Sequence, residues 1–221
     1  MKANRMRALF VAAVLFALPG TAFASPADGP VVRPQTYSTG NKFELTPVAG
    51  YVSNDPYYRI IAPGVMATYQ YSDRSAFEAH VFFDVNSEKT LLSQVRAQAK
   101  HDPEVVSRPK LTVTGDYMWS PIYGKLNAFG EVVLHYDFYL LGGVGVCQDE
   151  IQTSAATPGA VPVATSKVFP VTDMAFGQHF FLSRHVALRT ELRPVITWEN
   201  INGKWDPNGD VQINLGLSLL F

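Results

Sequence analysis

The stretch INLGLSLLF, residues 213–221, decides the fold class. Apolar side chains occupy every second position, and the positions between them hold Asn214, Gly216 and Ser218. A period of two is typical of a β-strand with one apolar face. Chain ends are usually polar and poorly ordered. We therefore expect this end, with Phe221 last, to be buried or recognised by another molecule.

Seven further stretches of roughly ten residues show the same alternation or a weaker form of it. They are separated by turn-forming residues and cover 42–52, 59–71, 76–85, 110–119, 131–140, 169–181 and 186–198. The third is the sharpest, because Phe77, Ala79 and Val81 alternate with Glu78 and His80. The sixth, 169–181, is too irregular for us to assign its two faces. Eight strands are therefore predicted from residue 42 to the last residue.

The polar positions favour a membrane barrel over a soluble β-sandwich, the alternative for the same alternation. They hold Glu, Asp, His and Arg among small residues and very little Lys, a mixture expected inside a small membrane barrel. The connections 72–75, 120–130 and 182–185 are mostly compact, whereas 86–109 and 148–167 are long. Short turns at one rim and long loops at the other are typical of such barrels. By strand count, the connections 53–58 and 200–210 fall on the long-loop rim. The prediction is an all-β, eight-stranded antiparallel up-and-down transmembrane β-barrel over 42–221.

The first residues predict export. Lys2, Arg5 and Arg7 precede an apolar run and a small-residue A-x-A site, the pattern of a secretory signal peptide over 1–24. Residues 25–41 are expected to be a periplasmic lead-in. Without the leader the chain has fifteen basic and nineteen acidic residues, a formal net charge of −4, which does not favour nucleic-acid binding. The single Cys147 is either a small buried residue or a free thiol.

The last strand also predicts partners. Alternating Leu217 and Leu219 with the terminal Phe221 resemble the C-terminal signal by which the outer-membrane assembly machinery recognises its barrels. An open strand edge is a template for pairing, so a nascent barrel could be held there before it closes. Outer-membrane localisation follows, with membrane lipid, lipopolysaccharide and this machinery as partners. We expect a monomer.

Two segments resemble a known family. YMWSPIYGKLNAFGEVVLHYDFYLLGGVGV (117–146) and FFLSRHVALRTELRPVI (180–196) are similar to small outer-membrane β-barrel domain proteins frequent in myxobacteria, themselves similar to OmpA-type eight-strand barrels. The resemblance covers most of 43–221. It implies a Gram-negative cell-envelope protein and no particular reaction.

Inward-facing charges should neutralise one another inside the barrel. Arg189 and Arg193 are expected to pair with Glu191 and with acids of other strands, because an unpaired buried charge is costly. The predicted polar network is Glu78, His80, Asp116, Glu131, His135, Asp137, Arg189, Glu191 and Arg193. We predict a structural or interaction role without catalytic residues, cofactor or metal.

Two other functions remain open. A lipid A-modifying barrel enzyme of the acylhydrolase type could use His135 with Asp137, or His80 with neighbouring acids, but no Ser or Thr stands at strand spacing beside His135. A narrow pore is the other alternative, although eight strands enclose a space just wide enough for side chains. An amphipathic helix is predicted over 87–100, and a flexible loop over 153–166.

Overall fold

The computed structural model describes residues 37–55, 58–90, 105–128, 132–153, 163–201 and 203–221. All of them belong to one compact unit, Gln35–Phe221. Among these residues no helix is both long enough and apolar enough to cross a membrane. The predicted signal peptide and residues 25–36 of the predicted lead-in lie outside the described residues.

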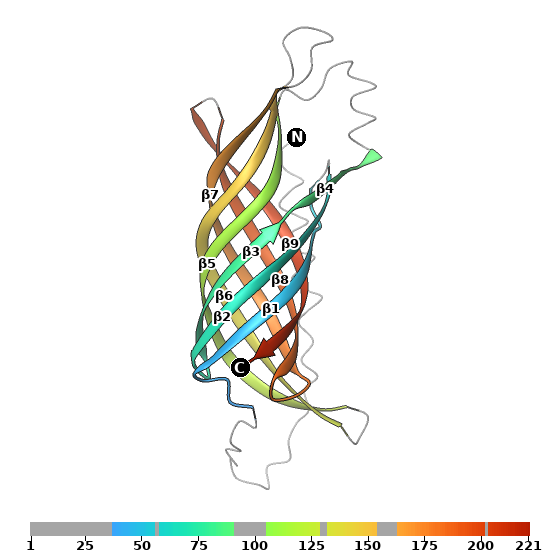
Figure 1. Cartoon of the computed structure of the whole chain (residues 1–221), viewed down its shortest axis with the longest axis vertical. Coiled ribbons are helices and arrows are strands. Elements are labelled where there is room, and N and C mark those ends of the chain that lie inside the picture. Colours follow the sequence, from blue (N-terminus) through green and yellow to red (C-terminus); the bar gives the residue numbers. More distant parts are fainter. Residues whose placement is uncertain (1–36, 56–57, 91–104, 129–131, 154–162, 202) are drawn as a thin grey trace, which may run out of the picture. The chain divides into compact units, whose positions relative to one another are not determined.

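The described residues form nine strand segments that make eight strands (Figure 1). Their bounds are β1 Lys42–Val52, β2 Tyr58–Ser72, β3 Ser75–Phe83, β4 Val85–Glu88, β5 Val105–Ala128, β6 Val132–Thr153, β7 Val163–Phe181, β8 Val186–Ile201 and β9 Lys204–Leu220. Only Asp84 separates β3 from β4, and both pair with β2. We therefore treat β3 and β4 as one interrupted strand.

Successive strands pair antiparallel, and β1 closes the ring against β9. Leu45 lies opposite Leu219 in this closing pair. The backbone N–H of Phe221 donates to the carbonyl of Phe43, with 2.9 Å between N and O. Closure leaves no open edge along the body of the barrel. The predicted eight-stranded antiparallel barrel is confirmed.

Alternation places apolar side chains outside and polar ones inside. On β1, Phe43 is 63% exposed and Glu44 only 3%; on β9, Leu215 is 56% exposed and Asn214 only 2%. The two faces predicted for seven of the strands are confirmed. On β7, whose faces were not assigned, the odd-numbered residues from Phe169 to Phe181 point inward.

The barrel has two rims. The C-terminal rim holds the turns 72–75 and 182–185 and the end of β9, and the opposite rim holds residues 53–55 and Gly203. The predicted loops 86–109 and 148–167 are partly wrong, because strands run into them: β4 reaches Glu88, β5 begins at Val105, and β6 and β7 extend to Thr153 and from Val163. These extensions satisfy backbone hydrogen-bonding groups that a loop would leave to water.

Two other predicted connections are also strand. The compact turn expected over 120–130 is wrong, since β5 continues to Ala128 and β6 resumes at Val132. The register shifts between Trp119 and Ile122, where Pro121 has no N–H to give the ladder. The loop expected over 200–210 is a tight hairpin in which Gly203 has a positive φ of 76°, a conformation that suits glycine.

Of the predicted helix over 87–100, residues 91–100 lie outside the described residues, as do 154–162 of the predicted flexible loop. Asn86, Ser87 and Glu88 belong to β4.

Exposed aromatic rings line the outside near the C-terminal rim. Phe43, Tyr69, Phe77 and Tyr117 follow one another in register on β1, β2, β3 and β5. The ring centroids of Phe43 and Tyr69 are 4.7 Å apart, and those of Phe77 and Tyr117 5.8 Å apart. Such a row is typical of a membrane-interface belt.

The sequence places Trp119, Tyr123, Trp198 and Trp205 near the predicted strand ends, where such belts are expected. Trp119, Trp198 and Trp205 are exposed as predicted. The prediction for Tyr123 is wrong, because its ring is partly buried against Phe181.

Candidate functional site

The interior of the barrel holds a cluster of charged side chains drawn from several strands. Each points inward because it occupies a buried position in the alternation of its strand, and each is at most 5% exposed. The cluster, called here the ionic network, consists of Glu78 and His80 on β3, Asp116 on β5, Tyr139 on β6, Asp173 on β7, and Arg189, Glu191 and Arg193 on β8.

The guanidinium group of Arg189 makes a bidentate ion pair with the carboxylate of Glu78. Its Nη1 lies 2.7 Å from Oε2 of Glu78 and its Nη2 lies 3.1 Å from Oε1. Nη2 also donates to Glu191 at 2.9 Å, and Nε donates to the hydroxyl of Tyr139 at 2.7 Å. The Tyr139 hydroxyl in turn donates to Glu191 at 2.8 Å. This buried guanidinium therefore meets acceptors with all three of its nitrogens.

Arg193 joins the remaining acids. Its Nε donates to Glu191 at 2.6 Å, and its Nη2 donates to Glu78 at 3.1 Å. Its Nη1 lies 3.3 Å from Asp116 and also contacts Asp173. Glu78 and Glu191 are thus shared by both arginines. A charge removed from such a network leaves its partners buried and uncompensated, which is strongly destabilising.

Two glycines make room for the network. A Cβ at Gly143 would lie 1.7 Å from the carboxylate of Asp116, and one at Gly177 would lie 2.0 Å from the ring of Tyr139. Both glycines are on strands next to the residue that they accommodate. The absence of a side chain there lets Asp116 and Tyr139 reach into the interior.

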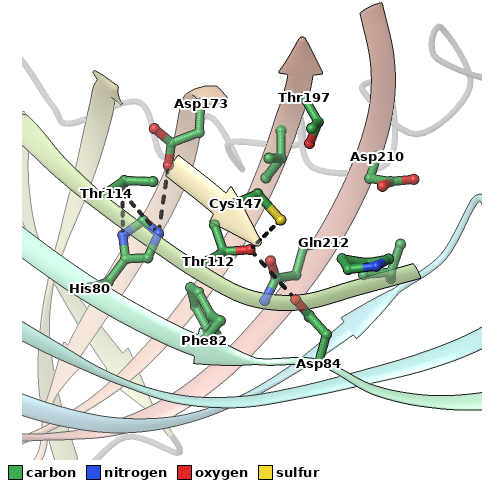
Figure 2. Close-up of a pocket in the computed structure, with 13 residues that line it drawn as sticks. His80, Phe82, Asp84, Thr112, Thr114, Cys147, Asp173, Thr197, Asp210 and Gln212 are labelled. Atoms are coloured by element: carbon green, nitrogen blue, oxygen red, sulfur yellow. Dashed lines mark hydrogen bonds and ion pairs between the residues drawn. The ribbon is translucent and has the colours of Figure 1, made fainter. Parts of the chain in front are cut away.

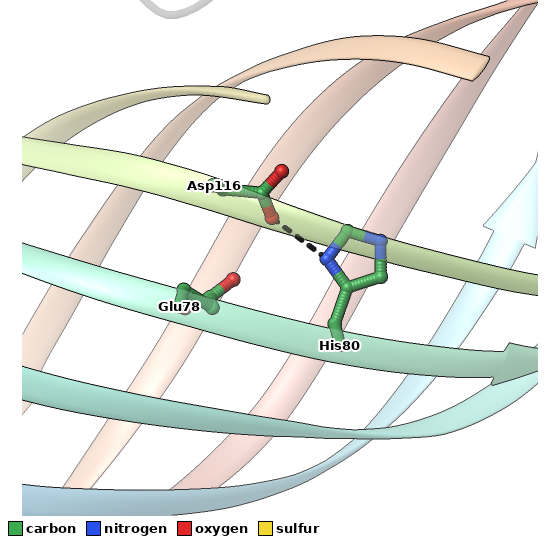
Figure 3. A group of neighbouring side chains, drawn as sticks. All are labelled: Glu78, His80 and Asp116. Carbon is green, nitrogen blue, oxygen red and sulfur yellow. Dashed lines mark hydrogen bonds and ion pairs between the residues drawn. The ribbon is translucent and has the colours of Figure 1, made fainter. Parts of the chain in front are cut away.

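Glu78, His80 and Asp116 form the one group of three potential metal ligands found among the described residues, with ligand atoms within 4.8 Å of one another (Figure 3). Nδ1 of His80 is 2.9 Å from Asp116 Oδ2 and 3.0 Å from Nη1 of Arg193. Two guanidinium groups already neutralise these acids, and a metal cation would have to displace them. The donor set therefore does not fit a metal site.

His80 also lies beside a hydroxyl. The Thr114 Oγ1 is 2.9 Å from each ring nitrogen of His80, and it also contacts Asp116. A hydroxyl, an imidazole and a carboxylate in contact are the components of a nucleophilic triad. Thr114 comes from β5, directly opposite His80 of β3, so this neighbourhood arises from strand pairing rather than from spacing within one strand.

A second group of charges lies nearer the C-terminal rim. His179 Nδ1 is 2.8 Å from Asp137, and its Nε2 is 3.3 Å from Glu44. Of the predicted network, Asp137 therefore contacts His179 and no arginine among the described residues. His135 is separate from both groups and packs edge-on against Tyr37, with ring centroids 4.7 Å apart. Glu131 lies outside the described residues.

Sequence reasoning missed Asp173, His179, Glu44 and Tyr139. Asp173 and His179 are on β7, whose faces could not be assigned from the sequence. A search for odd-numbered polar residues on that strand would have found both. Glu44 already stood on the polar face of its strand, and Tyr139 has the same parity as His135 and Asp137, so the alternation could have found both.

Cavities lie at both ends of the interior. At the C-terminal rim a cavity of about 310 Å³ is lined by Asp73, Arg74, Ser120, Pro121, Ile122, Tyr123 and Asp137. At the opposite rim a smaller one of about 30 Å³, called here the rim cavity, is bounded on one side by His80, Thr114 and Asp173 of the network region (Figure 2). Buried Cys147 lines it, and its thiol donates to Asp149 at 2.8 Å.

Acids gather around the mouth of the rim cavity. Loop residue Asn54 bonds the backbone of Gly209 and Val211, which places Asp210 at the level of the loops. Burial, together with Asp55, Asp84, Asp149 and Glu199, raises the pKa of Asp210 to about 7. The mouth is therefore a region of negative potential.

The chain matches no protein-family model and no curated protein significantly. Its fold is similar to that of the N-terminal β-barrel domain of Pseudomonas aeruginosa OprF, with a TM-score of 0.50 and 10% identity over 82% of this chain and 98% of that one. Neisserial surface protein A gives a TM-score of 0.48 and 10% identity over 81% and 96% of the two chains. The OprF likeness supports the fold: a small eight-strand barrel of the outer-membrane type.

Proposed function

We propose that this chain is an integral outer-membrane β-barrel protein of a Gram-negative cell envelope, with a structural or interaction role and no enzymatic activity. The observation that carries the proposal is the distribution of side chains: large apolar residues cover the outside of the closed ring, and paired charges fill the inside. A soluble protein would expose that apolar surface to water at a large cost. A lipid bilayer satisfies both faces.

Orientation follows from the rims. We place the C-terminal rim, with the turns 72–75 and 182–185 and the end of β9, in the periplasm, and the opposite rim outside. Lipid and lipopolysaccharide contact the apolar belt, and the assembly machinery recognises Phe221, Leu219 and Leu217. The strand extensions at the outward rim offer the surface for an interaction with other molecules. We also propose that the chain is related to the small barrel proteins of myxobacteria, on the resemblance of 117–146 and 180–196.

The interior is proposed to be closed to ions. Arg189, Arg193 and the acids that they share lie between the two cavities. Protein acceptors already meet the hydrogen-bond donors of both guanidinium groups, so these charges need no water-filled path through the barrel. Planar-bilayer recordings with purified protein test this: we expect no steady conductance at any polarity. Regular single-channel steps that are absent from a matched protein-free detergent control would contradict the proposal and indicate a narrow pore.

A lipid-modifying enzyme is the second candidate, favoured by the contact of Thr114 with His80 and of His80 with Asp116. Against it, the adjoining rim cavity encloses about 30 Å³, whereas small-molecule sites usually enclose some 300 Å³ or more. Incubation of the purified barrel with lipid A, followed by mass spectrometry, should show no change. Loss of an acyl chain that depends on Thr114 or on His135, tested by Thr114→Val and His135→Ala, would establish the enzyme instead.

A further inference from the structure

A β-hairpin made by β5 and β6 extends beyond the other turns of the C-terminal rim (Figure 1). The pairing of β5 with β3 ends at Trp119, and the pairing of β6 with β7 ends at His135. Among the described residues, β5 and β6 then pair only with each other, as far as Ala128 and Val132. This paired segment, 120–128 with 132–138, is called here the protruding hairpin. A two-stranded hairpin is marginally stable alone in water, so its side chains need contact with another surface.

A β-bulge decides which side chains of the hairpin share a face. Residues 120–121 of β5 stand opposite a single residue of β6, between the pairs Trp119–Leu140 and Ile122–Phe138. Trp119 and Leu140 are exposed on the outside of the barrel. One extra residue moves every later side chain of a strand to its other face. Beyond the bulge, the even-numbered residues of β5 therefore continue the outer side of the barrel.

The outer face of the hairpin is apolar. It consists of the three pairs Ile122–Phe138, Gly124–Tyr136 and Leu126–Leu134. Ile122 is 55% exposed and Leu126 is 48% exposed. The opposite face is mainly polar and carries Tyr123, Lys125, Val133, His135 and Asp137. The bulge thus turns the apolar residues outward and makes the hairpin amphipathic.

Ring contacts join this outer face to the apolar outside of the barrel. Phe138 stacks on Phe176 of β7 with ring centroids 5.7 Å apart, and Tyr136 meets Phe138 edge-on at 5.5 Å. The ring of Tyr136 lies over Gly124, where a Cβ would come within 2.4 Å of it. Phe176 lies opposite Leu140, and both are exposed on the outside of the barrel. One apolar surface therefore runs from the barrel onto the hairpin.

This continuity favours lipid as the molecule that covers the outer face. We propose that the outer face of the protruding hairpin lies against the periplasmic leaflet of the membrane, with Ile122 and Leu126 at the boundary between headgroups and acyl chains. The inference rests on the proposed function of the chain as an outer-membrane barrel. An amphipathic helix binds a bilayer surface in the same way, with its apolar face buried and its polar face in water. Tyr136 suits this position, because tyrosine rings are enriched at membrane interfaces.

Quenching of a fluorescent label by lipid tests this contact. The mature chain with Cys147→Ser and Leu126→Cys is labelled with an environment-sensitive dye. It is refolded in vesicles of phosphatidylethanolamine and phosphatidylglycerol that carry nitroxide groups on some acyl chains. Lys125→Cys, the neighbouring position on the opposite face, is the matched control. We expect the dye at position 126 to be quenched about threefold or more above the dye at position 125, since an interfacial apolar face enters the bilayer by about 5–10 Å.

Leu215→Cys, on the apolar outside of β9, is the reference for insertion of the barrel itself. Quenching at position 215 without quenching at 126 would overturn the inference and leave the membrane barrel intact. Absence of quenching at 215 would overturn both. Heat-dependent electrophoretic migration verifies that each variant is folded, and Ile122→Cys replaces Leu126→Cys if that variant does not fold.

Two further outcomes would contradict the assigned contact. Equal quenching at positions 125 and 126 would show that the two faces of the hairpin do not differ in their distance from lipid. Quenching at position 126 that falls as the protein-to-lipid ratio rises would show that a second copy of the chain covers the face.

Discussion

Arg189 is completely surrounded by the acids and the hydroxyl that bind it, and its side chain is 2% exposed. Replacing it by Met keeps the length and apolar stem but leaves Glu78 and Glu191 with one buried cation between them. We expect Arg189→Met to lower the free energy of unfolding by about 3–5 kcal/mol. Urea unfolding of the barrel in lipid vesicles measures it.

Arg184, exposed in the turn between β7 and β8, provides the control. Arg184→Met should change the unfolding free energy by less than about 0.5 kcal/mol. Similar effects of the two substitutions would show that the network contributes no more than a surface charge.

Asp73 gives the C-terminal rim a dependence on pH. Partial burial acts to raise the pKa of Asp73. Hydrogen bonds from the Ser38 hydroxyl and from the Gly40 and Thr39 amides outweigh this effect and hold the pKa of Asp73 below its usual value. The stabilisation that comes with a depressed pKa is present above the unfolded value of about 3.9 and is lost as pH falls through the folded value.

Amide hydrogen exchange tests this anchoring. Near neutral pH, Asp73→Asn should lower the protection of the Thr39 and Gly40 amides about fivefold or more, since a neutral amide oxygen accepts more weakly than a carboxylate. The difference from the unaltered protein should shrink in acid below the pKa of Asp73. Equal protection in both proteins at neutral pH would contradict a role for this carboxylate.

Single residues were predictable where alternation was clean. Glu78, Asp116, Arg189, Glu191 and Arg193 stand on polar faces that the sequence displays, and charge neutrality suggested which would meet. Asp173 was not predictable because its strand mixes Phe169, Val171 and Ala175 into the inward face. An interior that is partly apolar erases the contrast on which the period of two depends.

At the scale of the strand, the cost of an introduced charge depends on whether its position lies within the bilayer. Leu215 is 56% exposed in the middle of the apolar face of β9, and Val133 is 53% exposed in the β6 extension beyond the C-terminal rim. Leu215→Arg should cost about 2–4 kcal/mol in a bilayer, whereas Val133→Arg should cost about 1 kcal/mol or less. Folding titrations in lipid vesicles compare the two substitutions, and equal costs would refute the placement of Leu215 within the bilayer and of Val133 outside it.

Strand lengths were harder to predict than strand faces. β5, β6 and β7 have 24, 22 and 19 residues, about twice the 9–11 that cross a bilayer. The residues beyond the membrane are polar, proline-containing or small, and from sequence they resemble loops. These residues stay extended because neighbouring strands pair with one another. The sequence of one strand alone does not show this pairing.

For the whole molecule, closure depends on the seam between β1 and β9. Phe221 contributes a backbone hydrogen bond to Phe43 at that seam, and its side chain is 71% exposed. Burying such a ring in the interface contributes only about 1.5–3 kcal/mol. Deleting Phe221 should therefore change refolding in detergent little but reduce membrane insertion in cells several-fold, because slow assembly exposes unpaired strands.

For the Phe221 deletion and the unaltered chain, two quantities are measured: the refolding yield in detergent micelles and the abundance in the outer-membrane fraction of cells. Phe221→Tyr, which keeps an aromatic ring, serves as the control and should insert normally. Normal insertion of the deleted chain would mean that the terminal ring is an ordinary interfacial residue with no role in recognition.

The central claim is a closed barrel inserted in the outer membrane, and its electrophoretic behaviour tests that claim most directly. A ring of eight fully paired strands resists unfolding by dodecyl sulfate until it is heated. Membrane fractions of expressing cells should therefore contain a protein that migrates differently before and after boiling. Identical migration of both samples, together with recovery of the chain in the soluble periplasmic fraction, would contradict the account.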